Sequence, residues 1–183
     1  MVKVRPISVE EAKWFLRAKR DADVPSLIEA LRHPELRPSA VRRLGELRAH
    51  AAIPNIIPLL NASSDVLRRT AARALGRLQA KEAFEKLISI AASDPDNAAR
   101  AWALYAVGCI GVDDLDSRML QLTADPIPMV RQSAIAAVVA SRLPEVSAKG
   151  ARLRSAQPWR ERRAIDRVVE KIAETPPVPR DSS

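Results

Sequence analysis

The sequence is poor in the residues on which many catalytic and metal sites depend. Its 183 residues include one cysteine, Cys109, and two histidines, His33 and His50. One cysteine excludes an internal disulfide and leaves no cysteine-based zinc site. Five glycines are few for this length, which argues against sheets, barrels and phosphate-binding loops. Aromatic residues make up only 3%, so a stacking platform for single-stranded nucleic acid is poorly supplied.

Other features are missing as well. No apolar run reaches the roughly 18 residues that a membrane-spanning helix needs, and the N-terminus does not resemble a signal peptide, so we expect a cytoplasmic protein. We find no glycine-rich phosphate loop, no HExxH motif and no recognisable Ser/His/Asp context. The sequence therefore predicts a protein that is not an enzyme and needs no metal or cofactor. The net charge of +8, from 30 basic and 22 acidic residues, makes an anionic partner plausible.

An internal repeat dominates what is present. Four segments align without gaps, and each begins with an arginine. They are RPSAVRRLGEL from Arg37, RRTAARALGRL from Arg68, RAWALYAVGCI from Arg100 and RQSAIAAVVAS from Arg131. These four residues, here named the ladder arginines, are spaced by 31, 32 and 31 residues. A fifth, degenerate copy begins at Arg162.

Each segment places its apolar residues on one face of a helix, and a second amphipathic stretch precedes it. These stretches are VPSLIEAL, IPNIIPLL, EAFEKLISIA and LDSRMLQLTA, which begin at residues 24, 53, 82 and 115. Pro58 falls inside its stretch and predicts a kink or a late start. One helix pair cannot bury its apolar face alone, so neighbouring pairs must stack. The sequence predicts an all-α fold, a right-handed α-solenoid of about five helix pairs over residues 23–174.

The two ends differ from the repeats. Residues 1–22 are predicted to form an N-terminal capping helix, because Ser8 and Glu11 have the spacing of a capping box. Residues 158–174 form a basic amphipathic helix, which we interpret as the C-terminal cap with a polar outer face. Contact with a membrane surface or an acidic partner is the alternative. The polar, proline-rich residues 175–183 are predicted to be a disordered tail.

Glycine recurs at one place in the repeat. Gly45, Gly76 and Gly108 each lie eight residues after a ladder arginine. A glycine inside a helix costs about 1 kcal/mol relative to alanine, so its recurrence needs a reason. Without a side chain, the neighbouring helix can approach closely, and we predict such contacts between successive repeats.

These motifs resemble a known family. An aspartate, a Val-Arg or Ala-Arg pair and a segment such as AARALGRL are similar to the short HEAT-like repeats first noted in phycobilin lyases. The resemblance covers residues 23–143 and, weakly, the chain to 174. It implies a HEAT-like solenoid of the kind found in bacterial scaffold proteins, with second helices lining a concave surface. Asp94 with Arg100 and Asp125 with Arg131 match the family's Asp/Arg ladder.

The ladder arginines have two interpretations. We expect them to tie adjacent repeats together by pairing with turn aspartates, and contact with phosphate is the alternative. Cys109 lies in an apolar helix with no histidine nearby in sequence, so we expect a buried structural thiol.

A second stripe follows the positions one, five and nine residues after each ladder arginine. It is basic at both ends of the chain and small and apolar in the middle, where Tyr105 and Cys109 lie. Trp102 lies three residues before Tyr105, so the two rings are neighbours on the helix. An aromatic pair flanked by arginines resembles a protein-binding hot spot. The alternatives are that Trp102 packs against the next repeat and that the arginines form a solvated face.

The predicted function is that of a non-catalytic scaffold or adaptor whose concave face binds an acidic or amphipathic segment of a protein partner. The alternative is a nucleic-acid-binding protein that contacts the phosphate backbone through the same arginines. Residues 82–127 carry a net charge of −5, which a uniform nucleic-acid groove would not normally include. The candidate binding residues are Arg42, Arg69, Arg73, Arg77, Trp102, Tyr105, Arg163, Arg167 and Lys171.

Overall fold

The computed structural model describes residues 7–111 and 117–175, and the secondary structure of these residues is entirely helical. Of the predicted tail at residues 175–183, the structure describes only Thr175; residues 176–183 and the acidic positions 113, 114 and 116 lie outside the described residues. The α-helices are α1 (Val9–Arg20), α2 (Val24–Glu29), α3 (Arg37–Glu46), α4 (Ile53–Ile56), α5 (Asp65–Arg77), α6 (Phe84–Ser93), α7 (Asn97–Ile110), α8 (Ser117–Leu122), α9 (Pro128–Val139), α10 (Pro144–Ser155) and α11 (Trp159–Ala173).

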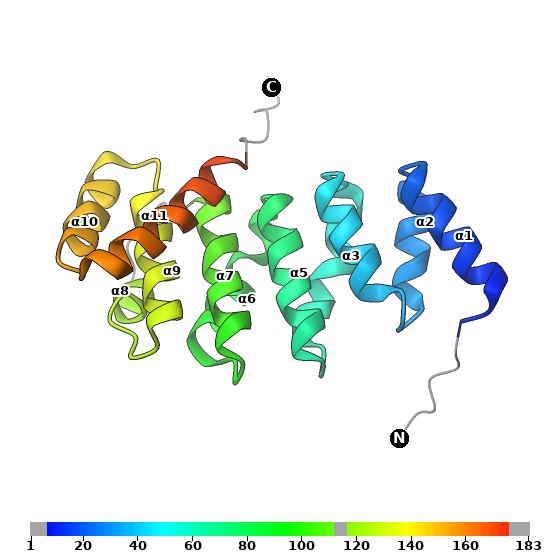
Figure 1. Cartoon of the computed structure of the whole chain (residues 1–183), viewed down its shortest axis with the longest axis horizontal. Helices are drawn as coiled ribbons and strands as arrows, with labels where there is room; N and C mark the ends of the chain where they lie inside the picture. Colours follow the sequence, from blue (N-terminus) through cyan, green and yellow to red (C-terminus); the bar gives the residue numbers. More distant parts are fainter. Residues whose placement is uncertain (1–6, 112–116, 176–183) are drawn as a thin grey trace.

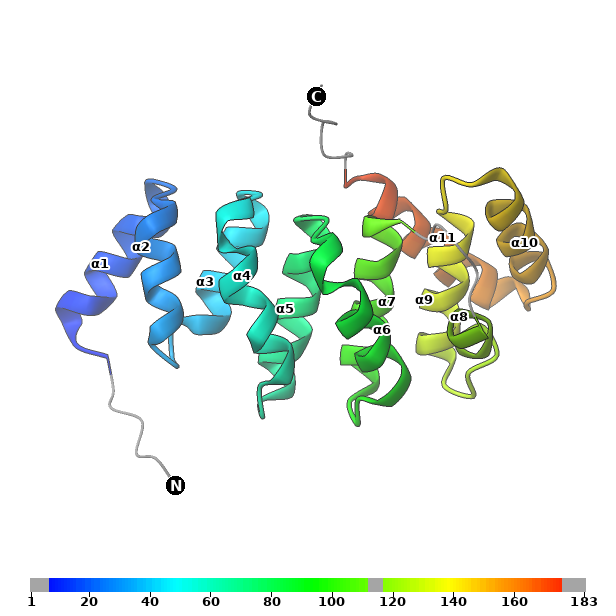
Figure 2. The ribbon, with the colours of Figure 1, turned by 180° about the vertical axis from the view of Figure 1, so that it is seen from behind.

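The helices form two layers. The second helices of the first four pairs, α3, α5, α7 and α9, lie side by side in chain order (Figure 1). The first helices, α2, α4, α6 and α8, lie behind them and come to the front when the molecule is turned (Figure 2). This arrangement confirms the all-α solenoid. We name the surface formed by α3, α5, α7 and α9 the second-helix face.

The first helices of the early repeats are short and end in tighter turns. Helix α2 continues as the 3₁₀ turn Ala30–Arg32. Helix α4 is followed by the 3₁₀ segment Ile57–Asn61, which has Pro58 in its first turn. Because proline lacks the amide hydrogen and its ring clashes with the preceding turn, it interrupts the α-helix there. Of the kink or late start predicted for Pro58, the structure shows no late start, and the α-helix instead changes to a 3₁₀-helix at this residue.

The N-terminal cap forms as its sequence indicates. The backbone amide of Glu11 donates to Ser8 Oγ at 3.1 Å, and the Ser8 amide donates to Glu11 Oε2 at 2.6 Å. These two bonds satisfy amides that would otherwise lack partners at the start of α1. On its inner side, α1 buries Phe15 and Ala18.

The recurring glycines mark the closest contacts between neighbouring second helices. A Cβ added to Gly76 on α5 would lie 2.7 Å from the Ala106 Cα on α7. A Cβ on Gly45 would lie 2.9 Å from the Ala74 Cβ. Both distances are too short for real Cβ atoms, so the helix spacing at these positions depends on glycine. The close approach predicted between successive repeats is confirmed.

The ladder arginines join one repeat to the next. Arg68 donates from Nε and Nη2 to the two carboxylate oxygens of Asp94, at 2.7 and 2.9 Å. Its Nη1 donates to the Ala62 carbonyl at 2.9 Å, inside its own repeat. Both charged side chains are largely buried. Hydrogen bonding from Arg68 lowers the pKa of Asp94, so the carboxylate stays ionised.

Two later ladder arginines also pair with carboxylates of the following repeat. Arg100 pairs with Asp125 of the next repeat. Arg131 pairs with Glu161, with Nη2 and Oε1 2.8 Å apart. The prediction that ladder arginines tie adjacent repeats together by pairing with turn aspartates is therefore confirmed for Arg68 and Arg100. Arg37 differs, because its Nε donates to the Leu31 carbonyl of its own repeat at 2.6 Å.

Helix α11 departs from the expected stack. It packs chiefly on α9 and also on α7, with little contact to its predecessor α10 (Figure 1). Ile165 is fully buried and packs in one cluster with Ala136, while Ile172 clusters with Tyr105 and Cys109. The predicted fifth, degenerate copy therefore packs on α9 as a second helix does, but it also lies across part of α7. The apolar middle of the predicted concave stripe was available as a packing surface, and this helix covers it.

Candidate binding site on the second-helix face

Two adjoining pockets lie on the open half of the second-helix face. The first, here named the arginine pocket, has a volume of about 200 Å³ and is lined by Arg42, Arg69, Thr70, Arg73, Ala74, Arg77 and Trp102. The second, here named the α11-side pocket, has a volume of about 260 Å³ and is lined by Gly45, Glu46, Arg48, Arg73, Arg77, Trp102, Tyr105, Lys171, Glu174 and Thr175. Because three side chains line both pockets, they form one continuous recognition surface.

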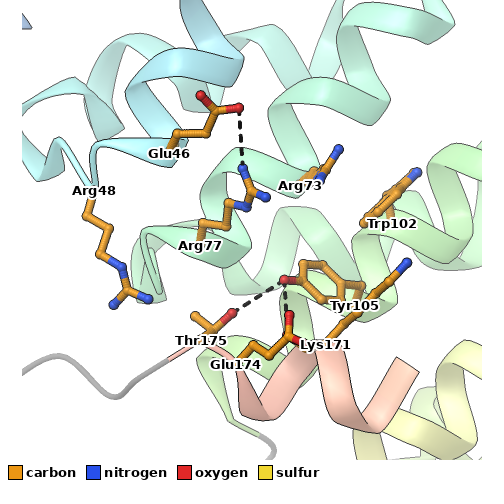
Figure 3. Close-up of a pocket in the computed structure, with 10 residues that line it drawn as sticks. Glu46, Arg48, Arg73, Arg77, Trp102, Tyr105, Lys171, Glu174 and Thr175 are labelled. Carbon is orange, nitrogen blue, oxygen red and sulfur yellow. Dashed lines mark hydrogen bonds and ion pairs between the residues drawn. The ribbon is translucent and has the colours of Figure 1, made fainter. Parts of the chain in front are cut away.

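Trp102 is the aromatic wall shared by the two pockets (Figure 3). The guanidinium carbon of Arg73 lies 5.0 Å from its ring centroid, and Lys171 Nζ lies 6.0 Å from it. Tyr105 meets the indole edge-on, with centroids 5.3 Å apart and ring planes at 83°. The indole therefore has a fixed orientation and holds a cation from the preceding repeat over its face.

Tyr105 supports this wall from below. It is only 7% exposed, because the C-terminal end of α11 covers it. Its hydroxyl lies 3.5 Å from the Lys171 carbonyl and 3.4 Å from Thr175 Oγ1. Burial raises the pKa of Tyr105, so the phenol stays protonated. The expectation that Tyr105 is an open anchor is wrong, since a partner can reach only a small part of it.

Cys109 lies on the same covered side of α7. It is 3% exposed, and burial raises the pKa of its thiol. The predicted buried thiol is confirmed. A protonated, inaccessible thiol is a poor nucleophile, so this position contributes packing to the site.

The arginines of the site differ in how far protein carboxylates neutralise them. Arg69 forms ion pairs with Asp65 and with Asp96, the latter at 2.7 Å. Arg77 lies 4.0 Å from Glu46, at the limit of an ion pair (Figure 3).

Arg42 and Arg73 are different. Over residues 7–111 and 117–175, neither Arg42 nor Arg73 pairs with a carboxylate. Arg42 is exposed, and Arg73 is half-buried against Trp102. Uncompensated positive charge therefore gathers in the arginine pocket.

The structure brings together most, but not all, of the predicted site residues. Arg42, Arg69, Arg73, Arg77 and Trp102 line the arginine pocket, and Lys171 joins them in the α11-side pocket. Arg163 and Arg167 line neither pocket. They project from the exposed side of α11, where the Arg163 guanidinium lies 5.6 Å from the Trp159 ring centroid.

Sequence reasoning missed several lining residues. Glu174 and Thr175 reach the α11-side pocket only because α11 folds back, and no local pattern indicated that. Arg48 had a weak signal, since it occupies the same repeat position as Gln79 and Gly111. All three have positive φ, at 53°, 48° and 111°, just after the ends of α3, α5 and α7.

In the described part of the chain, this surface is accompanied by neither a metal cluster nor a membrane-spanning helix. Among its residues, no group of three or more His, Cys, Asp or Glu side chains is placed to hold a metal ion. Nor does the same part of the chain contain a helix long and apolar enough to cross a membrane.

Comparison with known proteins agrees with this architecture. Residues 24–108 match the family model for HEAT repeats, a span that begins with α2 and ends within α7. The match therefore includes every residue that lines the arginine pocket. No curated protein matches the chain. HEAT repeats are generally protein-interaction scaffolds and are typically non-catalytic. The narrower likeness to phycobilin lyases stays a prediction.

Proposed function

We propose that this protein is a non-catalytic scaffold that binds an acidic segment of a protein partner across the arginine pocket and the α11-side pocket. The observation that carries the proposal is that Arg42, Arg73 and Trp102 line one pocket. Neither arginine has a carboxylate partner in the described chain, and Arg73 lies against the Trp102 ring. Arginine and tryptophan are the residue types that most often dominate protein-binding energy.

The shape of the basic surface favours a short protein segment over a nucleic acid. Helix α11 covers the second-helix face at α9 and part of α7, so the open basic surface is short. Glu46 and Glu174 line the α11-side pocket and would repel a continuous row of phosphates. A peptide can place its acidic groups at the arginines and neutral groups elsewhere. Backbone-directed nucleic-acid binding stays the alternative, to be decided by experiment.

The test uses a displayed library of random peptides selected on the intact protein. Selected peptides are measured by fluorescence anisotropy against the wild type and a triple variant, Arg42→Ala, Arg73→Ala and Arg77→Ala. The matched control replaces the exposed Arg17, Arg152 and Arg162 with alanine, because these residues line neither pocket. Both triple variants lose the same charge, so they separate site-specific binding from general electrostatic attraction.

The proposal expects acidic peptides that bind the wild type and the control with similar affinity and bind the pocket variant at least tenfold more weakly. Equal losses in the two variants would contradict it. A parallel titration with random duplex DNA and RNA covers the alternative. Binding that survives 150 mM salt, with a salt slope equivalent to several phosphates, would replace the peptide proposal.

A further inference from the structure

We infer that the arginine pocket binds the phosphate group of a phosphoserine or phosphothreonine in the partner segment. This inference rests on the proposed function and specifies the chemistry of the same site. It starts from the lining of the pocket, which contains four arginines and no carboxylate.

The charge balance distinguishes a phosphate from a carboxylate. Asp65 and Asp96 offset Arg69, and Glu46 lies at the distance limit from Arg77. Arg42 and Arg73 are therefore the two arginines of the pocket that have no carboxylate partner in the described residues. A carboxylate supplies one negative charge, whereas a phosphate monoester carries about −1.5 to −2 near neutral pH. One phosphate dianion can therefore pair with both of these arginines.

The positions of the two arginines suit a compact anion. Arg42 on α3 and Arg73 on α5 both lie five residues after a ladder arginine, so they occupy equivalent places on adjacent helices. Neighbouring packed helices have axes about 8–10 Å apart, so two long guanidinium side chains can converge on one group between them. The equivalent residues in the next two repeats are Tyr105 and Ala136, and both are buried. The pair formed by Arg42 and Arg73 is therefore confined to these two repeats and does not continue as a row of arginines along the second-helix face.

Arg73 is also prepared for bidentate binding. Its guanidinium carbon lies 5.0 Å from the Trp102 ring centroid, a cation–π contact that restricts the side chain without using its N–H donors. Tyr105 and α11 hold the indole in place, so the arginine loses less conformational freedom when a ligand binds. Arg–phosphate pairs are commonly bidentate, and a guanidinium held in one orientation favours such a pair.

The neighbouring α11-side pocket has a mixed lining, and it is continuous with the arginine pocket through Arg73, Arg77 and Trp102. It suits the residues that flank the phosphorylated one. Its glutamates disfavour a second phosphate nearby, so a segment with one phosphate should bind better than a densely phosphorylated one.

The experiment compares three pools of labelled degenerate eleven-residue peptides that differ only at the central position. That position is phosphoserine, glutamate or serine. Fluorescence anisotropy is measured at about 150 mM salt with the wild type, Arg42→Ala, Arg73→Ala, Arg73→Lys and the control Arg163→Ala. Free O-phosphoserine, inorganic phosphate and a duplex DNA serve as competitors. Circular dichroism and thermal melting establish that each variant is folded.

The inference expects the phosphoserine pool to bind at least tenfold more tightly than the glutamate pool. Arg42→Ala and Arg73→Ala should each remove most of this preference, Arg73→Lys should restore little of it, and Arg163→Ala should leave it intact. O-phosphoserine and phosphate should compete only at much higher concentrations than the peptides.

Other outcomes separate the inference from the proposed function. Equal affinity for the phosphoserine and glutamate pools overturns the inference and leaves the acidic-segment scaffold in place. Failure of these pools together with every displayed peptide overturns both. A phosphate preference that survives Arg42→Ala and Arg73→Ala overturns the assigned site. O-phosphoserine binding as tightly as the peptides identifies a small-molecule site, and stronger binding of duplex DNA identifies a nucleic-acid surface. Both results overturn the inference.

Discussion

Replacing Ala62 with aspartate should stabilise the first helix pair by giving the ladder arginine Arg37 the carboxylate partner that it lacks in the described chain. Ala62 lies six residues before Arg68, as Asp125 lies six residues before Arg131. Its φ and ψ of −62° and 146° are close to the −64° and 134° of Asp94, the rung partner of Arg68. An aspartate at this position therefore has the backbone geometry to face Arg37.

The magnitude follows from the existing rung. Arg68 and Asp94 share two charge-assisted hydrogen bonds, at 2.7 and 2.9 Å. Buried bonds to charged groups contribute about 1.5–3 kcal/mol each, but Arg37 is half-buried and both side chains lose rotamer freedom. We therefore expect a net gain in the free energy of unfolding of about 1–2 kcal/mol, where each kcal/mol raises the melting temperature by about 2–4 °C.

Urea unfolding and hydrogen exchange of the α2 and α3 amides measure this gain. Ala62→Asn is the matched control, because it keeps the size of the side chain and removes the charge. Adding Arg37→Gln should cancel the benefit of Ala62→Asp. The reasoning is refuted if Ala62→Asp and Ala62→Asn have equal stability, or if the gain persists without Arg37.

Three further outcomes are expected. Asp94→Asn should destabilise the protein by about 2 kcal/mol at pH 7 in urea unfolding. Because the pKa of Asp94 is lowered in the folded protein, the difference in stability between wild type and variant should be full above pH 3.8. It should vanish as the pH falls through the folded-state pKa, and a difference in stability that does not change with pH would contradict the pairing. Gly76→Ala should cost about 1 kcal/mol in the same assay, because overpacking of about 1–3 kcal/mol outweighs the gain of about 1 kcal/mol in helix propensity; a more stable variant would show that the helices separate freely. Ile172→Glu should speed Ellman labelling of Cys109 at least tenfold by loosening α11, and an unchanged rate would mean that α11 does not protect the thiol.

Much of the fold could be predicted because the same helix-pair pattern recurs several times along the sequence. Four aligned segments reveal the helix pairs, and the recurring glycines at Gly45 and Gly76 indicate where neighbouring helices touch. The ladder was also predictable as a link between repeats. Its pairing partners were not, because Arg68 reaches forward to Asp94 while the sequence spacing had matched Asp94 with Arg100. A motif defined by spacing within a repeat cannot distinguish pairing within a repeat from pairing between repeats.

The candidate site was predictable in part for the same reason. Arg69, Arg73 and Arg77 face one surface because a helix places residues four apart on the same side. Arg42 joins Arg73 because the two occupy equivalent places in adjacent repeats. The neutralisation of Arg69 was missed, since one of its two partners, Asp96, belongs to the turn before the next second helix.

The sequence by itself determined the helix pairs, the order in which they stack, and the face on which the arginines gather. Each of these follows from contacts within a repeat or between adjacent copies of it. Only the tertiary structure decided that α11 lies across α9 and α7, burying Tyr105 and ending beside Trp102. The apolar side of α11 had more than one surface on which to pack. The choice depended on a fit between Ile172 and residues more than 60 positions earlier, which no local periodicity specifies.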